Sequence, residues 1–149
     1  MNKKEIYGER HMRSLRIFLM FGALGWGICI LGVFLPWHIV VQGLYGLGAE
    51  NIVYDPMLKY WFRMVCGGFS VIGCMFAVSA YNPVKYWTLI PLLGWLSIIE
   101  GIIIGVHGLR LGLSAFPFYG DTGFCLLAGA GIIVLHRKIS KSEIIGGKC

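Results

Sequence analysis

Four long, almost entirely apolar segments constrain this chain more than any other feature. They cover residues 14–36, 57–80, 86–109 and 119–135. Each is close to the ~20 residues that an α-helix needs to cross the hydrocarbon core of a bilayer. Only 13% of the residues are charged and 57% are hydrophobic, whereas an ordinary soluble domain has about 25% charged residues. The sequence therefore predicts an all-α integral membrane protein, a four-helix bundle that forms one membrane domain over residues 1–149.

The connections between the segments differ in length. Residues 81–85 form a short turn around Asn82-Pro83, which predicts that the second and third helices are an antiparallel hairpin. Residues 37–56 are the one long connection, partly apolar and rich in glycine, and we expect it to lie along the outer membrane interface. The tails, residues 1–13 and 136–149, are expected in the cytoplasm.

This orientation rests on the basic residues, which gather beside the ends of the apolar segments. The charge bias also makes the lipid bilayer, and not nucleic acid, the expected partner of a chain with net charge +6. The smaller basic set, predicted outside, is Lys59, Arg63 and Arg110. The larger set, predicted inside, is Lys3, Lys4, Arg10, Arg13, Arg16, Lys85, Arg137, Lys138, Lys141 and Lys148.

An internal echo links the first and third segments. Leu24-Gly25-Trp26 recurs as Leu93-Gly94-Trp95, and the same offset carries His38 onto His107. Copies that are two helices apart would cross the membrane in the same direction. The echo predicts two helical hairpins related by a parallel repeat. Chance is the other explanation, because glycine and leucine are abundant in this sequence.

Small residues predict which helix faces pack, since close backbone approach drives helix association in lipid. The third segment places its glycines on one side with Ser97, Glu100 and His107, and an unbroken apolar surface on the other. The seams of the first two segments are predicted at Gly22, Gly25, Cys29 and Gly32, and at Cys66, Ser70, Gly73 and Ala77.

Glu100 is the outstanding ionisable residue, because it lies near the middle of the third segment. A bare charge there costs several kcal/mol, roughly 3 on insertion scales, so the carboxyl has to be paired, protonated or hydrated. Arg63 is the candidate partner. The two side chains lean in opposite directions along antiparallel helices, so water, Ser97 or a tyrosine is an alternative contact for each.

A second polar set is expected at the outer mouth, where Asp121 would begin the fourth helix and meet its dipole. Two interpretations are open. The residues snorkel to water and fix the helix ends, or Glu100 joins them in an outward-facing pocket for a small polar ligand, a quinone headgroup or protons. The set comprises Asp55, Arg63, His107, Arg110 and Asp121, together with His38.

Other chemistry has little support in the sequence. His38 and His107 could together ligate a haem iron if the repeat is real, but no cofactor is predicted. The cysteines form no C-x-x-C pair, and a bond from Cys29 to Cys66 or to Cys125 is left open. Nucleotide-binding and hydrolase motifs are missing, which argues against an enzyme.

At the level of pattern the chain resembles the small four-helix bacterial membrane proteins called DoxX-like. The features that carry the resemblance are the four segments, Arg63-Met64-Val65-Cys66-Gly67-Gly68 opening the second, the Asn82-Pro83 turn, and Asp121 opening the fourth. The resemblance implies the bacterial inner membrane and a respiratory accessory role, although the segment from Glu100 to His107 does not match the pattern.

From these features we predict a non-catalytic accessory or assembly subunit whose partners are other membrane subunits or copies of itself. The alternatives are a small transporter or ligand-binding protein with a polar pocket around Glu100, and a haem- or quinone-linked redox protein.

Overall fold

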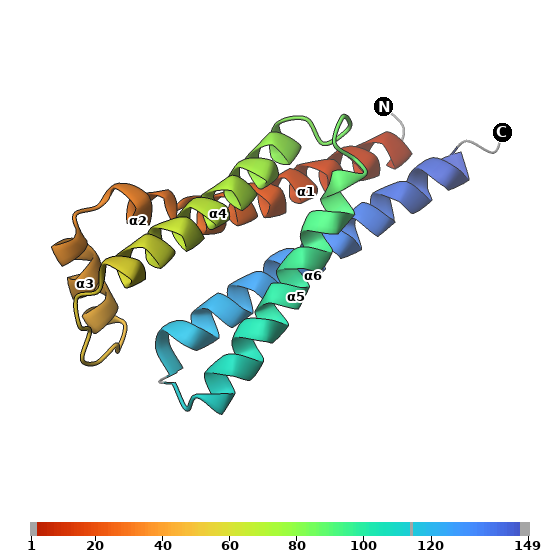
Figure 1. The fold of residues 1–149 in the computed structure, drawn as a ribbon. Coiled ribbons are helices and arrows are strands. Elements are labelled where there is room, and N and C mark those ends of the chain that lie inside the picture. The colour runs from red at the N-terminus through yellow and green to blue at the C-terminus, as the bar shows by residue number, and fades with distance from the viewer. Residues whose placement is uncertain (1–2, 114, 147–149) are drawn as a thin grey trace.

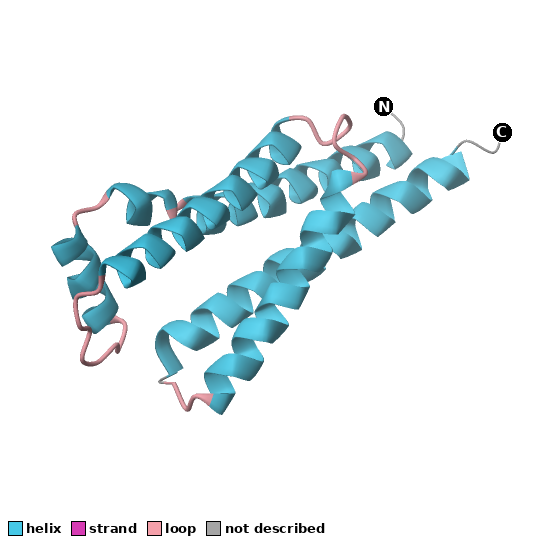
Figure 2. Ribbon diagram, in the orientation of Figure 1, coloured by secondary structure: helices cyan, strands magenta, loops and turns pink. Residues whose placement is uncertain are grey.

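The computed structural model describes the backbone of residues 3–113 and 115–146, and the side chains of residues 9–113 and 118–141. Within these residues all the regular structure is helical (Figure 2). The long helices are α1 (Lys3–Gly27), α4 (Pro56–Tyr81), α5 (Leu89–Arg110) and α6 (Ala115–Gly146), and the short ones are α2 (Ile30–Phe34) and α3 (Trp37–Gly46).

Four stretches of helix are long and apolar enough to cross a membrane: Glu9–Phe34, Pro56–Tyr81, Leu89–Arg110 and Phe118–Lys141. The predicted all-α membrane fold is therefore confirmed. The helices extend beyond the predicted segments into both expected tails, because α1 begins at Lys3 and α6 continues to Gly146. Basic residues such as Arg137 and Lys138 are good helix formers, so a charged sequence does not end a helix. Lys148 lies outside the described residues.

The first membrane span is interrupted where α1 gives way to α2. Around Cys29 the backbone N–H groups bond three residues back instead of four: Leu31 donates to Ile28 at 3.1 Å and Gly32 to Cys29 at 2.9 Å. This tightening is the 3₁₀ pattern. The residues that follow, expected as an interfacial connection, fold into α3 directly after Pro36.

Local signals in the sequence explain the other helix ends. Asp55 caps α4 by accepting a hydrogen bond from the backbone N–H of Met57 at 2.8 Å, and Pro56 occupies the first helical position. Asn82 ends α4 and its side chain accepts from the N–H of Lys85 at 3.1 Å. Gly112, with a φ of +61°, follows the end of α5 in the left-handed conformation that favours glycine.

The long helices form an open row in the order α4, α1, α6, α5 (Figure 1). Extensive contacts join α1 to α4, α1 to α6 and α5 to α6, whereas α4 and α5 barely touch. The two pairs diverge toward the end that carries α3 and the α5–α6 turn. Both ends of the chain and the α4–α5 turn lie at the opposite end. We call the α1–α4 and α5–α6 pairs the first and second hairpins.

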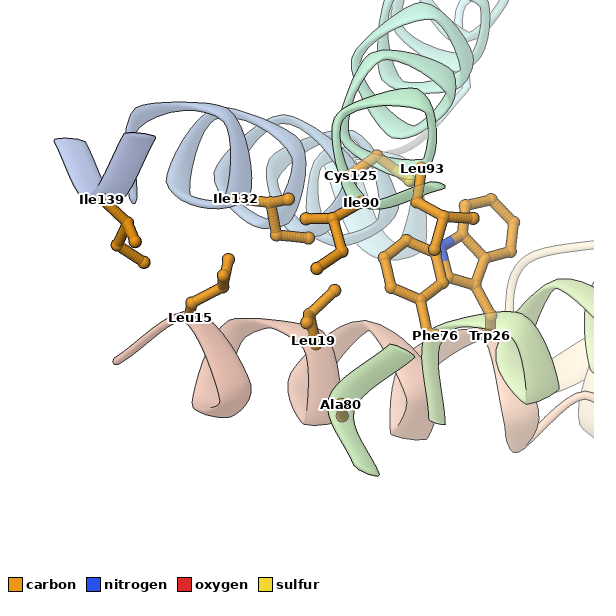
Figure 3. Close-up of a cluster of buried hydrophobic side chains, with 10 residues drawn as sticks. All are labelled: Leu15, Leu19, Trp26, Phe76, Ala80, Ile90, Leu93, Cys125, Ile132 and Ile139. Atoms are coloured by element: carbon orange, nitrogen blue, oxygen red, sulfur yellow. The ribbon is translucent and has the colours of Figure 1, made fainter. Parts of the chain in front are cut away.

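The core lies where α1 crosses the second hairpin (Figure 3). Leu15 and Leu19 of α1 are fully buried with Ile90 of α5 and Ile132 of α6. Phe76 and Ala80 of α4 extend this cluster, and Trp26 lies at its end nearest α2.

Glycines allow the closest approaches, as predicted. A Cβ on Gly129 of α6 would lie 2.6 Å from the carbonyl oxygen of Gly94, and one on Gly73 of α4 would lie 2.5 Å from the backbone nitrogen of Gly27. The small side of α5 is buried at Gly94, Ser97, Gly101 and Gly108. Ala77 does not follow the predicted seam of α4, because its side chain is exposed.

Candidate functional site

Three cavities follow one another between the two hairpins, and each shares lining residues with the next. The inner cavity, about 130 Å³, and the central cavity, about 150 Å³, share Trp26 and Phe69. The central cavity and the outer cavity, about 1170 Å³, share Ile104 and Asp121. We call the three together the cleft. The cleft leads to Glu100, near the middle of α5, from the end of the molecule that carries α3 and the α5–α6 turn, which we call the outer end.

The inner cavity lies on the side where α4 and α5 diverge. Its lining is apolar except for Ser97 and Glu100, and it consists of Trp26, Phe69, Ile72, Met75, Phe76, Leu93, Leu96, Ser97 and Glu100. Figure 3 shows three of these, Trp26, Phe76 and Leu93, side by side. Since α4 and α5 barely touch, this cavity is the part of the cleft that adjoins lipid.

Three aromatic rings and one carboxyl, that of Asp121, are in the lining of the central cavity. Trp26 packs edge-on against Phe69, with ring centroids 5.0 Å apart, and against Phe124 at 6.4 Å. The lining also includes Asp121, Cys29 and Cys125. Gly25 allows this packing, because a Cβ there would overlap the ring of Phe124.

The outer cavity opens between the residues that follow α3 and the far end of the second hairpin. Leucines and Phe118 form most of its wall, and Glu50, His107 and Asp121 are its ionisable lining. At about 1170 Å³ this cavity is somewhat larger than typical ligand sites, which measure about 300–1000 Å³.

Two carboxyls of the cleft, the partly buried Glu100 and the exposed Asp121, have no partner among the described residues. No hydrogen bond or ion pair joins Glu100 or Asp121 to another described side chain. Both interact electrostatically with Cys125, so their charges act on the central cavity together. An unpaired carboxylate in an apolar site has a large demand for a proton, a cation or a hydrogen-bond donor.

Trp26 also has a polar group without a partner. It is 7% exposed, and its indole N–H has no hydrogen-bond acceptor among the described residues. A buried donor without a partner costs about 1–3 kcal/mol. By contrast the hydroxyl of Ser97 is satisfied, because it donates to the carbonyl of Leu93 at 3.0 Å.

The structure unites only part of the predicted polar set. Glu100, Ser97, His107 and Asp121 line the cleft. Arg63 and Arg110 are exposed and line none of the three cavities, and the expected contact between Arg63 and Glu100 is not formed. Asp55 caps α4.

Asp121 differs from its predicted setting. It was expected to begin the fourth helix, but α6 begins at Ala115 and Asp121 lies in the second turn. The dipole effect fades beyond the first turn of a helix. The carboxyl therefore belongs to the wall of the cleft.

Sequence reasoning missed Trp26 and Glu50 as site residues. Trp26 stood out only as part of the Leu-Gly-Trp echo, and its counterpart Trp95 is 49% exposed. The local sequence does not distinguish Trp26 from Trp95. Their exposures differ because α1 and α5 present different sides to their neighbouring helices. Glu50 became a lining residue through the fold of the segment after α3.

The described residues hold no group of three His, Cys, Asp or Glu side chains close enough to bind a metal ion. His107 lines the outer cavity, but His38 lines none of the three, so the proposed haem pair does not share a cavity. The cysteines of this part of the chain are free thiols, at positions 29, 66, 74 and 125.

No protein-family model matches the chain, and no curated protein or solved structure matches it either. The resemblance to DoxX-like proteins stays a prediction.

Proposed function

We propose that this multi-pass membrane protein binds a hydrophobic ligand in the cleft between its two hairpins. The observation that carries the proposal is the series of cavities with shared lining residues, which runs from the outer end to Glu100 beside the barely touching α4 and α5. Because lipid surrounds an apolar side chain nearly as well as protein does, the helices have little drive to close this space, and an apolar molecule can occupy it.

The orientation that fits this function places the cleft mouth outside the cell. Apart from Lys148, which lies outside the described residues, the basic residues predicted inside belong to the first part of α1, the last part of α6 and the α4–α5 turn. These three segments share one end of the molecule (Figure 1). By the positive-inside rule this end faces the cytoplasm, and a bacterial inner membrane is the proposed location.

Photolabelling tests the ligand-binding proposal. The protein is reconstituted in liposomes with a neutral, apolar diazirine, and the labelled residues are mapped by mass spectrometry. We expect labels concentrated on cleft residues such as Phe69 and Leu93. Uniform labelling of every lipid-facing residue would contradict the proposal.

Two leucines of α5 provide a matched pair of variants. Leu96 and Leu92 are 50% and 53% exposed, but only Leu96 lines the inner cavity. Leu96→Trp should fill the cavity and remove most of the cleft labelling, whereas Leu92→Trp should leave it unchanged.

An accessory or assembly subunit is the second candidate. It is favoured by glycines that face no other helix: a Cβ on Gly67 or Gly68 of α4, or on Gly120 or Gly123 of α6, would meet nothing within 4 Å. Small residues on a lipid-facing surface allow another helix to approach closely.

Purification of the tagged protein in mild detergent distinguishes the candidates. A stoichiometric membrane partner that is lost in both Gly68→Ile and Gly123→Ile would support the subunit. Recovery of the protein alone or as a homodimer would argue against it. An absorption spectrum of the same sample tests for haem.

A further inference from the structure

The ionisable groups of the cleft favour a positively charged ligand. Glu50, Glu100 and Asp121 are in its lining, and no described lysine or arginine is. His107 at the mouth is the one imidazole there. The negative charges of these carboxylates repel an anion, and the repulsion is strong where the dielectric constant is low. A cation would instead be attracted to the unpaired carboxylates.

The aromatic rings indicate what kind of cation fits. Trp26, Phe69 and Phe124 surround the central cavity, and Asp121 is in the same wall. Aromatic rings attract cations through their negative faces, and rings beside a carboxylate suit an ammonium whose substituents are apolar. The central cavity is comparable in volume with engineered cavities of about 150 Å³ that bind benzene.

Trp26 marks the junction of the two cavities, because its side chain is in the lining of both. Its indole nitrogen is buried, so a ligand in the cleft meets the ring and not the N–H. Beyond that junction the inner cavity is lined mainly by apolar side chains, including Ile72, Met75 and Leu96.

We propose that the cleft binds an organic cation built in two parts. A quaternary ammonium lies in the central cavity against Asp121 and the rings, and an apolar group lies in the inner cavity beyond Trp26. Glu100, in the wall of the inner cavity, adds to the negative field. This inference rests on the proposed ligand-binding function and specifies its ligand class.

Two ligands of nearly the same shape test the charge. Benzoylcholine has the ammonium, the ester and a ring, and 3,3-dimethylbutyl benzoate replaces its nitrogen by carbon. Both are titrated calorimetrically into the protein in nanodiscs, with empty nanodiscs as background. We expect the cation to bind at least about tenfold more tightly than the neutral ester.

Variants then test the named contacts. Asp121→Asn should weaken benzoylcholine about tenfold and leave the neutral ester unchanged. Asp55→Asn is the matched control, because it removes an outer acid away from the cleft while asparagine still caps α4. Trp26→Phe replaces the ring type that attracts cations best by a weaker one, so it should weaken benzoylcholine and leave the neutral ester nearly unchanged. Thermal unfolding of each variant checks that it is folded.

The outcomes separate the two proposals. Equal affinity for both esters would overturn the cation inference and leave the ligand-binding function standing. Failure of both esters to bind, with the cleft still photolabelled by the neutral diazirine, would also overturn the inference alone. Failure of both esters together with uniform photolabelling would overturn the function as well.

Discussion

The two sides of the helix row differ sharply in how they pack. On the side where α1 crosses α6, Leu15, Leu19 and Ile132 are completely buried. On the side where α4 faces α5, Met75 and Leu96 are about half exposed, at 45% and 50%, although both line the inner cavity. The residues are equally apolar on the two sides. Apolar composition in a membrane therefore does not itself cause helices to close, and the fit of small residues decides where they meet.

The largest effect is expected from breaking a close backbone contact within the second hairpin, between α6 and α5. In Gly129→Ala the new Cβ would lie 2.6 Å from the oxygen of Gly94 and 3.0 Å from the backbone nitrogen of Ile98. Backbone cannot move aside easily, so we expect a loss of roughly 3 kcal/mol in the free energy of unfolding. Reversible unfolding in mixed micelles measures it.

Gly123→Ala is the control on the same helix, because a Cβ there meets nothing within 4 Å. This change should stabilise the protein by up to about 1 kcal/mol, since alanine favours helix more than glycine. Equal effects of the two substitutions would mean that α5 and α6 are not as close as described.

An effect of comparable size is expected from truncating core leucines. Leu19→Ala removes a fully buried side chain and should cost about 2–4 kcal/mol. Leu96→Ala on the open side should cost less than about 1 kcal/mol, because lipid or ligand replaces the lost contacts. Similar losses would indicate that α4 and α5 close in the bilayer.

Spin-label distances test the same contrast without changing packing. In a cysteine-free background, labels at Met75 and Leu96 span the open side, and labels at Met20 and Val134 span the closed side; all four residues are 45–50% exposed. We expect a broad distribution for the first pair that narrows with benzoylcholine, and a narrow one for the second pair throughout. Two equally narrow distributions would remove the distinction.

The smallest effect is expected from Glu100→Gln. Since Glu100 has no partner among the described residues, the change removes no ion pair, and stability should move by less than about 1 kcal/mol. A loss of more than about 2 kcal/mol would mean that Glu100 is paired in the membrane, with Arg63 as the first residue to test.

The candidate site was only partly predictable. Glu100, Ser97, His107 and Asp121 stood out as polar residues on apolar segments, and all four line the cleft. Arg63 was equally conspicuous but lines none of its cavities. Its position on α4 relative to the neighbouring helix, and not its type, sets this difference. Trp26 was missed because an apolar ring in an apolar segment carries no local signal.

The sequence by itself determined that four stretches can span the membrane and roughly where each lies, since an unbroken run of apolar residues must satisfy its backbone within a helix. It also determined the turn at Asn82-Pro83 and the packed side of α5. The hairpin of the second and third helices that was expected from this turn is not a packed pair, since α4 and α5 barely touch. Tertiary structure alone decided that α4 and α5 stand apart, that Trp26 is buried while Trp95 is exposed, and that Asp121 faces a cavity. The physical reason is that lipid and protein are nearly equivalent surroundings for an apolar side chain, so hydrophobicity cannot specify which helices touch.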